Sequence, residues 1–136
     1  MNLEEIEKSL PNGFHDSYIE KVSIDYFKQE ASFRLNILTG VPSAEDKSGR
    51  ETYRKASLTL SGLLYFVVEP PDPKYPYEKE GALWMDAGPV GSVHLKTTTK
   101  LPDEVPEGAF RYWIYIRNWN SFIHFAAMDA QFDWID

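Results

Sequence analysis

FRYWIYIRNWNSFIHFAA, residues Phe110 to Ala127, contains two apolar and aromatic runs joined by a polar corner at Asn118 to Ser121. Successive side chains of a strand point to opposite faces, so the first run predicts a strand with one apolar and one mixed face. The apolar face carries Phe110, Tyr112, Ile114 and Ile116, and the mixed face carries Arg111, Trp113, Tyr115 and Arg117. The second run, from Phe122 to Ala127, predicts the antiparallel return strand. The stretch therefore predicts a hairpin at the centre of the fold.

Other alternating or β-branched runs predict further antiparallel strands on both sides of this hairpin. They are Tyr18 to Phe27, Ala31 to Leu38, Tyr53 to Ser61, Leu63 to Val68 and Ser92 to Thr99. Gly62 stands between two of these runs and predicts a bulge, a bend or a close approach of another segment. Asp86 to Pro89 has the composition of a turn, and Asp129 to Asp136 is expected to form a last apolar anchor.

A short helix is predicted at the N-terminus. Asn2 can cap it, and Glu4 and Glu5 place negative charge in its first turn, where the helix dipole favours it. About seven strands and one short helix, with no long helices between them, predict a mainly β (α+β) fold. We expect an antiparallel β-sandwich or a partly open barrel with one short N-terminal helix, in a single domain over residues 1–136.

Composition limits the classes of function. The 136 residues carry 14 basic and 21 acidic side chains, a net charge of −7, which disfavours binding to nucleic acids and anionic membranes. The sequence has no cysteine, which excludes disulfides, thiolate metal sites and a cysteine nucleophile. It also has no apolar run long enough to span a membrane and no apolar leader at Met1, so we expect a cytoplasmic protein.

The aromatic content of 15% is high for a core of this size, so some rings are expected at a surface. The candidate binding surface is the mixed face of the central hairpin and its corner. It consists of Trp113, Tyr115 and Trp119, flanked by Arg111 and Arg117. Trp, Tyr and Arg are the usual anchors of protein interfaces, and they also form platforms for small ligands. The alternative is that another segment covers this face and makes it part of the core.

The histidines form the alternative candidate site. His15, His94 and His124 lie in separate segments, and no two of them have the short spacing of metal ligands, so no metal or other cofactor is predicted. His15 is followed by Asp16, and a carboxylate beside an imidazole can serve metal binding or acid–base chemistry. The alternative is structural, with Asp16 closing the turn after Gly13 and His15 preceding the strand.

No phosphate-binding glycine loop, nucleophile elbow or dinucleotide fingerprint is present, so no catalytic residue is assigned. Several short motifs resemble those of a group of small uncharacterised bacterial proteins that share a Gly-Phe/Leu-His-Asp opening before a β-rich body. They are Leu10 to Asp16 (LPNGFHD), Ile24 to Tyr26, Gly62-Leu63, Glu69 to Asp72 and Trp119 to Phe122. Some proteins with a similar opening look like immunity proteins of bacterial toxin systems. The resemblance implies no catalytic residues.

Three functions are consistent with these features. The first is a non-enzymatic, immunity-like binding protein that engages a protein partner through acidic and aromatic surface. The acidic surface suits a basic partner. The second is a small-ligand or metal-dependent enzyme that uses His15 and Asp16 with His94 or His124. The third is a homodimer formed through strand edges or the Trp113 face. Charge, aromatic content and the lack of a catalytic motif favour the first.

Overall fold

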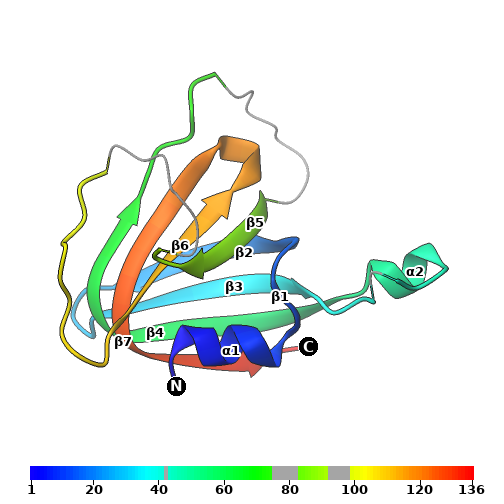
Figure 1. Cartoon of the computed structure of the whole chain (residues 1–136), viewed down its shortest axis with the longest axis horizontal. Helices are drawn as coiled ribbons and strands as arrows, with labels where there is room; N and C mark the ends of the chain where they lie inside the picture. The colour runs from blue at the N-terminus through cyan, green and yellow to red at the C-terminus, as the bar shows by residue number, and fades with distance from the viewer. Residues whose placement is uncertain (42, 75–82, 92–98) are drawn as a thin grey trace.

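A computed structural model describes residues 1–41, 43–74, 83–91 and 99–136 of the chain. Six strands form a closed antiparallel barrel in the order β2-β3-β4-β7-β6-β5 (Figure 1). The prediction of a mainly β fold with one short N-terminal helix is confirmed, and the architecture is a barrel. The elements are α1 (Leu3–Ser9), β1 (Pro11–Phe14), β2 (Ser17–Asp25), β3 (Glu30–Leu38), α2 (Lys47–Arg50), β4 (Tyr53–Val68), β5 (Leu83–Pro89), β6 (Phe110–Ile116), the 3-10 turn η1 (Arg117–Trp119) and β7 (Ser121–Trp134).

The predicted central hairpin is confirmed as β6 and β7, in which Trp113 pairs with His124 and Ile114 with Ile123. The turn η1 joins them, and Asn120 adopts the left-handed conformation at its end, with φ of 46°. The C-terminal residues, expected to form a last apolar anchor, continue β7 to Trp134 and pair with the first half of β4. Phe132 packs against the core, whereas Trp134 and Ile135 are exposed.

The two runs around Gly62 form one long strand, β4, with an irregularity in its pairing to β7 between Leu63 and Tyr65. Gly62 has φ of +60°, a conformation that residues with a Cβ rarely adopt. A Cβ built on Gly62 would also lie 2.9 Å from the Cβ of Met128 on β7. Of the predicted alternatives, the close approach of another segment is present at Gly62 itself, and the irregularity in pairing follows between Leu63 and Tyr65.

Replacing Gly62 with alanine should lower the free energy of unfolding by about 1–3 kcal/mol, since it adds backbone strain and a contact with Met128. Urea denaturation measures the change. Gly91→Ala is the matched control, because Gly91 also has a positive φ, +93°, but among the described residues no atom lies within 4 Å of a Cβ at this position. Equal losses for the two variants would show that the contact with Met128 contributes nothing.

The predicted turn at Asp86 to Pro89 was wrong, because these residues complete strand β5. Gly88 is buried opposite Trp113 of β6, and Pro89 occupies the last position of the strand. A glycine can stand in a strand where a large neighbouring ring needs space, and proline is tolerated at a strand end. The predicted strand from Ser92 to Thr99 falls almost entirely outside the described residues.

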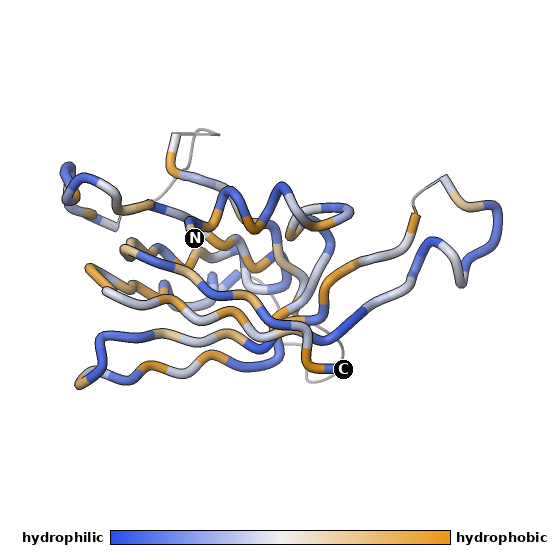
Figure 2. Tube along the Cα trace, turned by 90° about the horizontal axis from the view of Figure 1, so that it is seen from below, coloured by the Kyte–Doolittle hydropathy of each residue, from blue (hydrophilic) through white to orange (hydrophobic). Residues whose placement is uncertain are grey.

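Apolar side chains from every strand of the barrel fill its interior. Hydrophobic and hydrophilic residues alternate along the strands (Figure 2), as expected when one face of a sheet is buried. Helix α1 lies against the barrel and buries Leu3 and Ile6, while Phe14 of β1 is also buried. Leu3 and Phe14 share a cavity of only about 10 Å³ with residues of β3 to β7, which is too small to hold a ligand.

A polar contact joins α1 to the barrel wall. The hydroxyl of buried Tyr112 on β6 donates a hydrogen bond to the Glu7 carboxylate. Burial raises the pKa of Glu7, and the hydrogen bond from Tyr112 offsets only part of this shift. Burial and the nearby Glu7 carboxylate also raise the pKa of Tyr112. Ionised Glu7 is therefore held in the fold at a cost in stability.

The pKa of Glu7 is higher in the folded state than in the unfolded state. Its contribution to the free energy of unfolding is therefore fully present below the unfolded-state pKa of about 4.3 and is lost as pH rises through the folded-state pKa. Glu7→Gln keeps an oxygen that accepts from Tyr112 but cannot ionise. We expect its stability relative to wild type to increase between pH 4 and pH 7, measured by urea denaturation. Glu107→Gln, at an exposed position in another segment, is the control. A Glu7→Gln variant that loses relative stability over this range would contradict the account.

Candidate functional site

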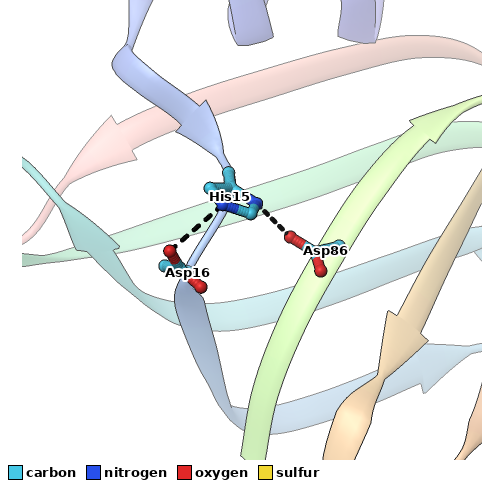
Figure 3. A group of neighbouring side chains, drawn as sticks. All are labelled: His15, Asp16 and Asp86. Carbon is cyan, nitrogen blue, oxygen red and sulfur yellow. Dashed lines mark hydrogen bonds and ion pairs between the residues drawn. The ribbon is translucent and has the colours of Figure 1, made fainter.

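The pairing of β2 with β5 brings together residues that are far apart in the sequence. Ser17 pairs with Met85 and Tyr18 with Trp84 in antiparallel register. One step further along each strand, Asp16 and Asp86 therefore come to the same edge of the barrel. His15 precedes Asp16 in the turn between β1 and β2 and lies beside them (Figure 3).

His15 lies between two carboxylates. Its Nδ1 is 2.5 Å from Oδ1 of Asp86, and its Nε2 is 3.1 Å from Oδ2 of Asp16 (Figure 3). A neutral imidazole can donate from only one of its nitrogens, so only one of these contacts is then a hydrogen bond. These three residues are the group within the described part of the chain whose donor atoms lie close enough to hold a metal ion.

Asp16 is held from several sides. Its other carboxylate oxygen, Oδ1, accepts a hydrogen bond from Nη2 of Arg117 at 2.7 Å, and its carbonyl oxygen accepts one from the Tyr53 hydroxyl at 3.3 Å. Its backbone has φ of 54°, a conformation that aspartate tolerates better than most residues. Asp16 can therefore close this turn, as predicted, and also take part in a site with His15 and Asp86.

An open cleft of about 650 Å³ adjoins this cluster. Asp16 and Arg117 line it together with Tyr53 and Trp84, and α2 contributes Arg50. The guanidinium of Arg117 lies 5.6 Å from the centre of the Trp84 ring, within the range of a cation–π contact. The cleft thus has aromatic walls and charges of both signs, and Arg117 is its one member from the predicted aromatic surface.

The rest of that predicted surface is largely covered. Trp113 is only 8% exposed, and its Nε1 donates to the carbonyl oxygen of Pro89 at 3.2 Å. Tyr115 is half-buried and donates from its hydroxyl to Oδ1 of Asn120 at 2.5 Å, while Trp119 packs against the core. Arg111 is half-buried and donates to the Asp103 carbonyl oxygen at 3.0 Å. The five residues therefore do not form one exposed platform.

The segment after β4 runs along this hairpin. The backbone N–H of Glu69 donates to the Phe122 carbonyl oxygen at 3.0 Å, and that of Asp72 donates to the Trp119 carbonyl oxygen at 2.8 Å. Hydrogen bonds from the N–H of Lys74 and from the Asn120 side chain lower the pKa of Asp72. Glu69 and Asp72, in the described first part of the proline-containing connection, are thus fixed to the hairpin.

The histidines do not converge as a group. His124 is fully buried and its Nε2 lies 3.1 Å from Oε2 of Glu69, while no hydrogen-bond partner for its Nδ1 is found in the described part of the structure. Glu69 also accepts from the Phe122 N–H at 3.0 Å and from the Thr99 hydroxyl at 2.6 Å. His124 therefore belongs to a buried network separate from His15, and His94 lies outside the described residues.

Glu69→Ala should lower the free energy of unfolding by about 2–4 kcal/mol, because it removes the acceptor of several buried donors at once. Chemical denaturation measures the loss. Glu104→Ala, an exposed substitution in another connection, is the control and should change stability by less than about 0.5 kcal/mol. A Glu69→Ala variant as stable as this control would show that the network does not hold the connection in place.

Sequence reasoning missed the two most exposed aromatic side chains of the described residues. Tyr26 and Phe27, predicted as strand residues, instead form the β2–β3 turn and are 84% and 102% exposed. Asp25 ends β2, and its carboxylate accepts from the Lys28 N–H at 3.0 Å, an arrangement that favours a turn over a continued strand. Gln29 closes the turn with φ of 53°. In the sequence, Asp25 was the one residue that could have indicated a turn at Tyr26 and Phe27.

Comparisons of the chain with protein-family models, with curated proteins and with solved structures found no match. Within the described residues, no helix has the length and apolar character needed to cross a membrane.

Proposed function

We propose that this chain is a non-enzymatic binding protein that engages a basic protein partner through acidic and aromatic surface. The observation that carries the proposal is the exposed pair Tyr26 and Phe27 at the β2–β3 turn. Large aromatic side chains anchor protein interfaces because they bury much apolar area with few torsional freedoms to lose. An immunity-like role, binding a toxin, is the form of this function that the resemblance of residues 10–16 implies.

The aromatic turn is held in a defined conformation, which favours binding. Asp25 caps it, and the carbonyl oxygen of Gln29 accepts a hydrogen bond from the Leu63 N–H of β4 at 3.0 Å. A rigid anchor loses less conformational entropy on association than a mobile one. A groove of about 240 Å³ lies beside the turn, between it and the β4 bulge, where Leu64 is exposed. The surface thus combines a protruding anchor with an adjacent recess lined by both polar and apolar side chains.

The charge of the chain indicates the kind of partner. A net charge of −7 attracts a basic protein at long range and repels an acidic one. Two steps are expected: electrostatic attraction brings the partner close, and burial of Tyr26 and Phe27 in an apolar pocket of the partner provides most of the affinity.

Affinity capture from a lysate of the organism that encodes the chain tests the proposal. Wild type should retain a stoichiometric basic protein, and the double variant Tyr26→Ser, Phe27→Ser should bind that protein at least about 30-fold more weakly. Lys28→Ser is the matched control in the same turn, because its backbone N–H still bonds to Asp25. Equal retention by wild type and the double variant, or no stoichiometric partner, would refute the proposal.

A homodimer is the alternative use of the same surface. Sedimentation at increasing concentration distinguishes a homodimer from a complex with another protein, since only self-association changes the mass of the purified chain.

The ligand- or metal-dependent alternative is favoured by a different observation, which is that Asp86 joins His15 and Asp16 in space.

A further inference from the structure

We propose that Nε2 of His15 and the carboxylate of Asp16 bind a divalent transition-metal ion, with Asp86 orienting the imidazole. The three side chains meet because the register of β2 on β5 sets their positions, as Figure 3 shows. Two of the three are adjacent in the sequence, and the third is 71 positions away along the chain from His15.

The contact with Asp86 decides which nitrogen is available. Nδ1 of His15 is 2.5 Å from Oδ1 of Asp86, so in the neutral imidazole the proton is on Nδ1 and is donated to this carboxylate. The lone pair is then on Nε2. Metal-binding histidines in proteins commonly have this arrangement, in which a carboxylate accepts from one nitrogen and the metal binds the other.

The contact with Asp16 then needs a cation. With the proton on Nδ1, Nε2 and Oδ2 of Asp16 are two acceptors facing each other at 3.1 Å. Such a pair is favourable only with a proton or a metal ion between its members. A divalent ion with bonds of about 2.1 Å separates neighbouring ligand atoms by about 3.0–3.4 Å, so the observed distance suits two ligands of one ion.

The surroundings favour binding of an ion that keeps water ligands. The His15 side chain is 68% exposed, so water can complete the coordination shell. The turn conformation holds Asp16 in place before an ion arrives. Arg117 also competes for the charge of Asp16. An imidazole ligand with a single carboxylate suits Zn²⁺, Ni²⁺ or Cu²⁺ better than Ca²⁺ or Mg²⁺, which prefer oxygen.

This site is independent of the aromatic turn. Asp16 precedes the first residue of β2 and Tyr26 follows the last, and a strand of nine residues is roughly 27 Å long. Loss of metal binding should leave capture of the protein partner unchanged, and loss of the aromatic turn should leave metal binding unchanged. Failure of one proposal is therefore distinguishable from failure of the other.

Isothermal titration calorimetry with ZnCl₂ and with NiCl₂ tests the site on the full chain. Wild type should bind one ion, while His15→Ala and Asp16→Asn should bind at least about tenfold more weakly, and Asp86→Asn about tenfold more weakly. Arg117→Met should bind more tightly, because it removes the competing cation; a purely structural cluster would not show this gain. Asp133→Asn, an exposed carboxylate of β7, is the matched control and should bind as wild type does.

Two further measurements keep the result interpretable. Circular dichroism in chelator checks that each variant is folded, and His15→Gln replaces His15→Ala if the latter is not. In wild type, Ni²⁺ should broaden the imidazole resonances of His15 before those of His94 or His124. Absence of binding at millimolar metal, equal affinity of wild type and the His15 variant, or earlier broadening of another histidine would overturn the proposal.

Discussion

The short pairing of β2 with β5 is the contact on which both the barrel and its candidate site depend. Only Ser17, Tyr18 and Ile19 of β2 take part, opposite Met85, Trp84 and Leu83. This pairing joins the two ends of the sheet and closes the barrel over three residue pairs, and the described part of β5 offers no partner to β2 beyond Ile19. It also places the turn after β1 beside β5, which is why His15, Asp16 and Asp86 meet. A shift of one residue would turn every side chain of this pair to the other face.

The filled interior explains why the candidate sites lie outside the barrel. Small barrels hold either side chains or one small ligand. Here α1 and β1 contribute Leu3, Ile6 and Phe14 to the core, and the residual cavity is too small for any ligand. Binding residues must therefore be at the ends and the outer face. The aromatic turn at one end of β2 and the His15 cluster at the other are two such places.

Local sequence patterns predicted much of the fold. The β6–β7 and β2–β3 hairpins follow from strand alternation, the helix from its cap and first-turn charges, and the close approach to β7 from Gly62. The errors have local causes as well. Gly88 and Pro89 have turn composition, but Trp113 opposite Gly88 and the strand end at Pro89 allow β5 to continue. The residues after Ala127 alternate weakly, and β7 continues there because β4 is long enough to pair with it.

The site was less predictable, because it depends on the register between distant segments. His15 and Asp16 could be singled out as neighbours, but nothing in the sequence indicates that Asp86 completes the group. Which aromatic side chains are exposed depends on tertiary packing, which the sequence pattern does not show. Trp113 alternates with core residues and so was expected on an outer face, yet it is covered there, whereas Tyr26 and Phe27 lie in a turn that Asp25 creates.

The measurement that tests the central claim most directly is hydrogen–deuterium exchange of the chain with and without its captured partner. If the aromatic turn is the binding surface, the partner should slow exchange in residues 24–29 and 63–66, and little elsewhere in the barrel. Slowed exchange confined to other segments, such as α1 or the cleft beside Trp84 and Arg117, would contradict the account.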